Sequence, residues 1–103
     1  MGTFNQVEIE DAKKAIEAGT CTIVDIRDPG SYEEAHIDGA VHLNDATVEE
    51  FLRHTDRQKP VLVYCYHGNS SRNAAAWLAE QGFEQVSSMN GGFEEWRSRY
   101  LAG

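Results

Sequence analysis

The sequence predicts an α/β domain in three layers, with a mostly parallel sheet of about five strands and helices on both faces. Strand-like and helix-like patterns alternate along the whole chain. The apolar run over residues 61–64 is continuous, which is typical of a parallel strand covered on both faces. With 103 residues, 41% of them hydrophobic and 25% charged, we expect one domain over residues 1–103.

Each element follows from a local pattern. Short apolar or alternating segments predict strands over residues 6–9, 22–26, 40–43, 61–64 and 84–89. Apolar residues at helical spacing predict helices over residues 10–18, 47–54, 71–81 and 93–100. Asp28 followed by Pro29 is typical of an N-cap and a first helical position, and predicts a short helix to about residue 35. Gly19 and Gly82 supply helix stops, and Gly91 with Gly92 turns the chain into the last helix.

Composition and charge exclude several partners. The net charge is −8, from 17 acidic and 9 basic residues, which argues against nucleic acid and against anionic membrane surfaces. No apolar run has the length of a membrane span, and no signal peptide pattern opens the chain. Two cysteines make no disulfide framework, so we expect free thiols and a cytoplasmic location. No zinc-ligand spacing is present, so we expect neither a metal nor another cofactor.

The segment over residues 61–78 carries the chemistry. Its apolar strand ends on Cys65, a loop containing Gly68 follows, and an Ala-rich helix begins at Ser71. Backbone N–H groups and the dipole at a helix N-terminus favour negative charge, so a thiol placed there has a depressed pKa and reacts as a thiolate. Buried strand-end cysteines are often inert, but an inert cysteine needs no glycine and serine loop. We therefore interpret Cys65 as a nucleophile.

Four segments of the chain resemble the single-domain rhodanese family of sulfurtransferases. The loop Cys-Tyr-His-Gly-Asn-Ser-Ser over residues 65–71 is similar to the family's active-site loop. Residues 25–33 resemble its Asp-x-Arg…Glu-Tyr segment, residues 36–43 its His-Ile-x-Gly-Ala stretch, and residues 89–96 its Gly-Gly-x-x-x-Trp close. These segments have the family's order and spacing over essentially the whole chain.

The resemblance implies a rhodanese-like fold and a thiosulfate sulfurtransferase that works by a ping-pong reaction through a Cys65 persulfide. It implies a small anionic sulfur donor, and cyanide or a thiol or dithiol such as thioredoxin as the acceptor. Converging N–H groups of the loop would stabilise the anionic persulfide. The substrate-binding residues expected on this basis are Tyr66, His67, Gly68, Asn69, Ser70 and Ser71.

The chain departs from the family pattern at two points, and other functions are also open. Ala35 stands where the family has a glycine, and the loop has no Arg or Lys, which leaves the identity of the donor open. A phosphatase or arsenate reductase would need Arg six residues after the cysteine, whereas Ser71 stands there and Arg72 follows. A persulfide carrier or sensing module for one protein partner, and a regulatory domain without chemistry, are further alternatives.

Other candidate residues receive mainly structural interpretations. We expect Asp25 and Arg27 to make polar contacts near a strand end rather than to act in catalysis, and Cys21 to serve packing. His67 is ambiguous, and we expect a supporting role in which it orients substrate or lowers the thiol pKa. Trp77, like the other large aromatics, is expected in the core because it lies at helical spacing.

Overall fold

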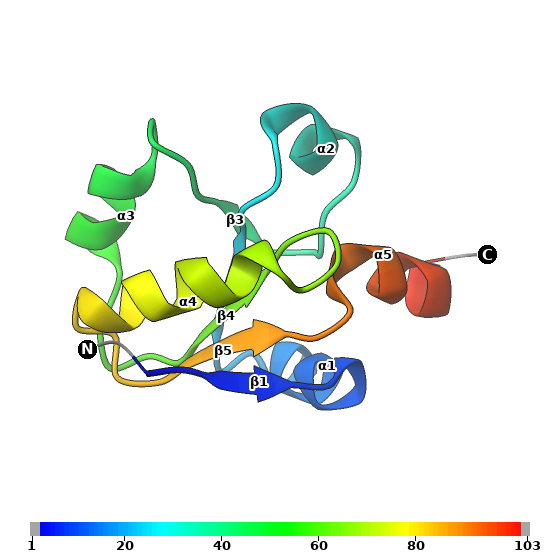
Figure 1. Ribbon diagram of the computed structural model, residues 1–103, viewed down its shortest axis with the longest axis horizontal. Helices are drawn as coiled ribbons and strands as arrows, with labels where there is room; N and C mark the ends of the chain where they lie inside the picture. Colours follow the sequence, from blue (N-terminus) through cyan, green and yellow to red (C-terminus); the bar gives the residue numbers. More distant parts are fainter. Residues whose placement is uncertain (1–2, 102–103) are drawn as a thin grey trace.

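The computed structural model describes residues 3–101 and contains a five-stranded sheet (Figure 1). The strands are β1 (Asn5–Val7), β2 (Thr22–Asp25), β3 (Val41–His42), β4 (Val61–Tyr64) and β5 (Val86–Met89). Their order across the sheet is β1-β5-β4-β2-β3, and every pairing among the described strands is parallel. The α/β prediction is confirmed, and β4 lies at the centre of the sheet.

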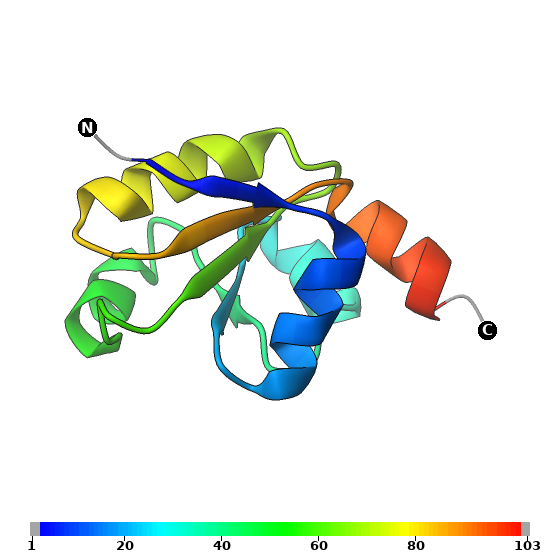
Figure 2. The same cartoon turned by 90° about the horizontal axis from the view of Figure 1, so that it is seen from below.

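Helices cover both faces of the sheet, as predicted (Figure 2). They are α1 (Ile9–Ala18), α2 (Pro29–Glu34), α3 (Val48–His54), α4 (Ser70–Glu80) and α5 (Gly92–Trp96), with a π-helical turn η1 (Arg97–Leu101) after α5. Side chains of α1 and α5 form one core cluster, and those of α3 and α4 form the other. None of the helices within residues 3–101 is long and apolar enough to cross a membrane.

The central strand β4 divides its side chains between the two clusters. Leu62 and Tyr64 pack with α1 and α5, while Val61 and Val63 pack with α3 and α4. This alternation is the two-residue period of a strand, and all four side chains are buried because both faces are covered. The chain therefore leaves β4 between two packed layers, and Cys65 is the first residue past its carboxyl end.

Several predicted boundaries were wrong by a few residues. Ile9 was expected to end the first strand but begins α1, where its side chain is buried in the core. The last strand begins at Val86 rather than at residue 84, and the third strand has only two residues. A single apolar residue satisfies either the strand period or the helix period, so the sequence pattern does not fix where one element gives way to the next. The predicted last helix is also divided, since η1 continues α5 with π-helical geometry.

The N-terminus of α5 holds the loop that follows β4. The Phe93 N–H donates to the Cys65 carbonyl over 2.8 Å, and the Glu94 N–H donates to the Tyr66 carbonyl over 3.0 Å. Gly92 has φ +64°, and a Cβ there would lie 2.6 Å from the His67 nitrogen and closer still to the Tyr66 carbonyl group. Only glycine allows this approach, so Gly92 fixes the loop against α5.

We expect Gly92→Ala to destabilise the protein more than Gly19→Ala. Gly19 has a nearly matching φ of +69°, but a Cβ there would meet nothing within 4 Å. Both changes place alanine in the left-handed region, at about 1–2 kcal/mol each. Gly92→Ala adds a backbone collision, and we expect about 1–3 kcal/mol more from it. Urea unfolding of both variants measures the difference, and equal losses of stability would contradict the close approach.

Candidate active site

Cys65 is the first residue of the loop that joins β4 to α4, and the course of this loop is visible in Figure 1. The N–H groups of Gly68 and Ser71 each donate to its Sγ over 3.2 Å, and the thiol donates to the Ser71 hydroxyl over 3.3 Å. Gly68 has φ +94°, and a Cβ there would lie 3.0 Å from the Gly91 nitrogen. The loop therefore turns its N–H groups inward around one sulfur, and Cys65 as a whole is only 5% exposed.

This arrangement lowers the pKa of the Cys65 thiol below its ordinary value. Burial works in the opposite direction and is the largest single influence. The hydroxyl of Ser71 and the N–H groups of Ser71, Gly68 and His67 together outweigh it by hydrogen bonding to the sulfur. The sulfur also faces the N-terminus of α4, where the helix dipole favours an anion. The site thus favours a thiolate without any formal positive charge at the sulfur.

The Ser71 hydroxyl contacts a second buried hydroxyl, that of Ser88. Ser71 Oγ lies 2.8 Å from Ser88 Oγ, and both residues are fully buried. Ser88 lies on β5, beside β4 in the sheet, so it approaches the loop from below the carboxyl end of the central strand. Ser88 was not among the residues predicted from the sequence, although a serine near the end of an otherwise buried strand was the available signal. Its contact fixes the position of the Ser71 hydroxyl that meets the thiol.

The Arg72 side chain is bound to the loop that contains Cys65. Its Nε donates to the Gly68 carbonyl over 3.0 Å, and its Nη2 donates to the Asn69 side-chain oxygen over 2.7 Å. A phosphatase-type reading requires a guanidinium that is free to clamp a tetrahedral oxyanion beside the sulfur. Here the guanidinium binds two oxygens of the protein, in agreement with the expectation that Arg72 is no such clamp. Its visible role is to hold the Gly68 carbonyl while the Gly68 N–H points at the thiol.

The Tyr66 side chain extends away from the thiol toward the N-terminus of α2. Its hydroxyl donates to the Asp28 carboxylate and lies 2.5 Å from the Ser31 hydroxyl. Asp28 also caps α2 by accepting from the Ser31 N–H, as the sequence predicts for its N-cap. The hydrogen bonds from Tyr66 and Ser31 lower the pKa of Asp28 to about 2. Tyr66 therefore ties the loop to α2, and no sequence pattern predicts this contact between distant segments.

The remaining loop side chains are open to solvent. His67, Asn69 and Ser70 are exposed, and among residues 3–101 the side chains of His67 and Ser70 have no hydrogen-bond partner. Of the six predicted binding residues, Gly68 and Ser71 contact the sulfur through their N–H groups. The other side chains lie around the entrance or turn away from it.

Asp25 and Arg27 form a buried ion pair, as expected from a structural role. Arg27 Nη2 lies 2.8 Å from Asp25 Oδ2, and the two side chains are 2% and 0% exposed. The guanidinium also donates to the Ala35 carbonyl over 2.6 Å and lies 4.1 Å from the ring centroid of Phe93. Burial and the nearby Asp25 carboxylate raise the pKa of Tyr64. The pair joins the end of β2 to the start of α5, and so supports the helix that anchors the loop.

Other titratable residues lie in structural settings. His36 and His42 stack on Tyr32, with ring-centroid distances of 4.0 and 4.8 Å. Within the described part of the chain, no group of three or more His, Cys, Asp or Glu side chains is placed to hold a metal ion. Cys21 is a free, half-buried thiol packed beside the core cluster of α1 and α5, and burial raises its pKa. Cys21 thus has the packing environment that the sequence predicts.

The fold and the Cys65 loop define a class of protein that sequence comparison also identifies. The rhodanese-like domain family matches residues 8–99, and the chain belongs to this family. It is 50% identical over 100 residues to the thiosulfate sulfurtransferase GlpE of Pseudomonas entomophila, an alignment that covers 97% of this chain and 91% of that protein.

Solved structures agree with the fold. The rhodanese-like domain of an Anabaena protein superposes with a TM-score of 0.83 at 27% identity, over 95% of this chain and 76% of that one. A rhodanese-related protein from Thermoplasma volcanium gives a TM-score of 0.78 at 24% identity, over 94% of each chain. The second likeness concerns the fold alone.

We expect Arg72→Met to raise the pKa of the Cys65 thiol, because the Gly68 carbonyl and Asn69 lose the contacts that keep the loop N–H groups inward. The rate of Cys65 alkylation by iodoacetamide at pH 7 should fall about threefold, since only the thiolate reacts. The pH dependence of that rate measures the pKa directly. Arg72→Lys keeps the charge but loses the fork of two donors, and Arg53→Met on the exposed side of α3 is the matched control. An unchanged pH profile in Arg72→Met would contradict this role.

Proposed function

We propose that this protein is a thiosulfate sulfurtransferase that moves a sulfane sulfur through a Cys65 persulfide. The observation that carries the proposal is the convergence of the Gly68 and Ser71 N–H groups, with the Ser71 hydroxyl, on one sulfur. The similarity to GlpE of Pseudomonas entomophila over 97% of the chain supports the same activity and donor.

In the first half-reaction, the Cys65 thiolate attacks the outer sulfur of thiosulfate. A bond forms between Cys65 Sγ and that sulfur, the sulfur–sulfur bond of thiosulfate breaks, and sulfite leaves with the electron pair. The three negative charges of the reactants are conserved in one persulfide anion and one sulfite dianion. The inward N–H groups of the loop stabilise the thiolate and then the persulfide, as preorganised donors do in other anion cradles. His67, Asn69 and Ser70 lie around the entrance and are assigned to contacts with the donor, whereas the Tyr66 side chain is bound to Asp28 and Ser31 at α2.

In the second half-reaction, a nucleophile takes the outer sulfur from the persulfide. Cyanide forms thiocyanate, and a thiol forms a new persulfide, while Cys65 recovers its electron pair as a thiolate. With a dithiol such as thioredoxin, the second thiolate then releases hydrosulfide and closes a disulfide. Division into two steps makes each displacement easier than a direct transfer. Free thiols on both partners require a reducing compartment, so we place the reaction in the cytoplasm.

The rival functions find less support. Oxyanion processing lacks a free clamp, because Arg72 binds the Gly68 carbonyl and Asn69. A regulatory domain without chemistry has no need of the N–H groups around Cys65. A persulfide carrier for a single protein partner would use the same cradle, and differs in that it loads once and does not turn over on small molecules.

We expect thiosulfate to add one sulfur atom to the wild-type protein and to Cys21→Ala, but not to Cys65→Ser. Intact mass after rapid desalting measures the addition, and circular dichroism checks that each variant is folded. Steady-state thiocyanate formation should fall to background in Cys65→Ser and stay near the wild-type rate in Cys21→Ala. Wild-type protein that loads but forms only one equivalent of thiocyanate would identify a carrier. Near-normal turnover in folded Cys65→Ser would exclude the mechanism.

A further inference from the structure

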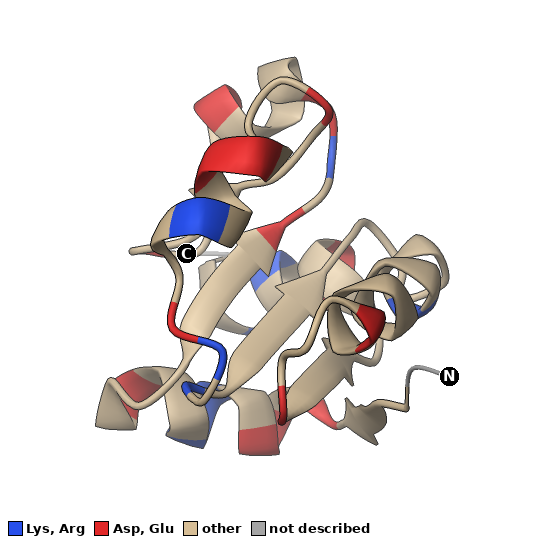
Figure 3. Ribbon diagram, turned by 90° about the vertical axis from the view of Figure 1, so that its left-hand side faces the viewer, with Lys and Arg blue, Asp and Glu red and all other residues tan. Residues whose placement is uncertain are grey.

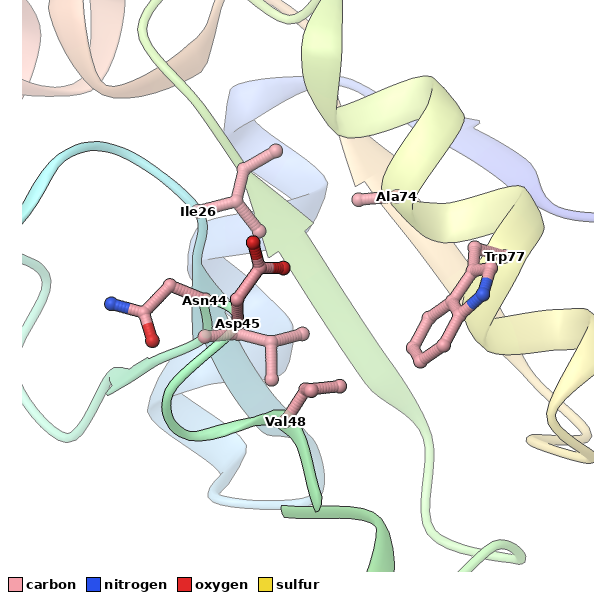
Figure 4. Close-up of a pocket in the computed structure, with 7 residues that line it drawn as sticks. Ile26, Asn44, Asp45, Val48, Ala74 and Trp77 are labelled. Atoms are coloured by element: carbon pink, nitrogen blue, oxygen red, sulfur yellow. The ribbon is translucent and has the colours of Figure 1, made fainter. Parts of the chain in front are cut away.

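An open apolar groove lies beside α4, on the face of the sheet that α3 also covers (Figure 4). Its volume is about 370 Å³. The apolar residues that line it are Ile26, Leu43, Val48, Ala74 and Trp77. Trp77 was expected in the core, but it is 39% exposed and turns toward the groove from α4 (Figure 4). An indole left open to solvent within an apolar groove is typical of a surface that binds a partner.

The groove begins next to the Cys65 loop. The Ile26 N–H donates to the Tyr64 carbonyl over 3.1 Å, so Ile26 lies at the carboxyl end of the strand that Cys65 follows. Ala74 and Trp77 come three and six residues after Ser71 on the same helix. At about 1.5 Å per residue, they lie about 4.5 and 9 Å along the helix axis from Ser71. The groove therefore runs outward from the edge of the loop that surrounds Cys65.

A protein acceptor has to cover this edge of the loop during sulfur transfer. Cys65 is 5% exposed, so an attacking thiol must come to the loop instead of meeting a projecting persulfide. An extended segment advances about 3.3 Å per residue. A residue two or three positions from the acceptor's cysteine consequently lies about 7–10 Å away, over the groove.

The charges around the groove favour a cationic partner. The Asp45 carboxylate projects into it (Figure 4), and Asp45 has no ion pair with any residue from 3 to 101. The side chain of Asn44, the other polar lining residue, accepts from the Ala46 and Thr47 N–H groups of its own turn. Acidic residues recur on the helices of the face in Figure 3, and the whole chain carries a net charge of −8. A Lys or Arg in the partner would thus meet an unpaired carboxylate.

We propose that this groove is the docking surface for a protein thiol acceptor, which places a large apolar side chain against Trp77 and a Lys or Arg toward Asp45. The apolar residue lies two or three positions from the reacting cysteine of the acceptor. This inference rests on the proposed sulfurtransferase function and adds to it the chemistry of the acceptor. In the transfer, the acceptor thiolate bonds to the outer sulfur, the bond from that sulfur to Cys65 Sγ breaks, and Cys65 retains the electron pair.

Two synthetic peptides of equal length test the proposal. Each contains one cysteine in a Gly/Ser chain, and one of them carries Leu three positions and Lys four positions after the cysteine. The wild-type protein, loaded from thiosulfate and desalted, should transfer sulfur about tenfold faster to the Leu/Lys peptide. Trp77→Ala should lose this preference and keep the wild-type rate with cyanide, which does not need the groove. Trp77→Phe should retain most of it.

Two further variants separate the contacts. Asp45→Asn should lose the part of the preference that depends on Lys and on low salt. Leu101→Ala removes another exposed apolar side chain, which is 53% exposed in η1 and does not line the groove, and this variant should change nothing. A preference that survives Trp77→Ala, or an equal loss of the cyanide rate in that variant, would overturn the docking surface.

A binding measurement distinguishes this proposal from the proposed function. The Leu/Lys peptide with Ser in place of its cysteine is titrated into unloaded protein and followed by NMR. Chemical-shift changes centred on Ile26, Val48 and Trp77 support the groove, whereas no binding or changes centred elsewhere count against it. Failure of thiosulfate to load Cys65 would count against the sulfurtransferase proposal, and the titration would still decide whether the groove takes the peptide.

Discussion

The site depends on one constraint: the short loop after β4 has to turn several N–H groups inward upon a single sulfur, which leaves carbonyl oxygens pointing outward. Three of these outward carbonyls accept hydrogen bonds from α5, which is distant in sequence, or from α4, the helix that follows the loop. The Cys65 carbonyl accepts from Phe93, the Tyr66 carbonyl from Glu94, and the Gly68 carbonyl from Arg72. Since buried backbone groups require partners, these three contacts hold the inward geometry in place.

The same constraint explains the polar centre of an otherwise apolar core. The helix that satisfies the Cys65 and Tyr66 carbonyls begins at Gly92, and Phe93 packs under the Arg27 guanidinium. Arg27 is itself neutralised by Asp25 at the end of β2. A buried pair of this kind adds little net stability, but loss of one partner leaves an unpaired charge. Its value here is positional, because it fixes the end of β2, the start of α5 and the residues between them around one edge of the sheet.

Local and global electrostatics act on different steps. The N–H groups around Cys65 act over a few ångströms and favour a negative charge on the sulfur. The net charge of −8 acts at longer range, opposes accumulation of anions near the protein and favours cationic partners. The N–H groups around Cys65 and the acidic surface are therefore compatible, because the first act at the sulfur and the second acts at longer range.

The sequence by itself determined the alternation of strands and helices, the parallel sheet, the position of Cys65 past the central strand, and the N-cap at Asp28. The individual strands, helices and the cap follow from patterns within about ten residues, and the parallel sheet follows from the alternation of strands and helices along the chain. It did not determine the start of α1 at Ile9, because one apolar residue fits either period. Only the tertiary structure decided the contacts of Ser88 with Ser71 and of Tyr66 with Asp28, as well as the exposure of Trp77. These features depend on which strands are neighbours and on which face of a helix meets the sheet. Both are set by packing between segments that are far apart in the sequence.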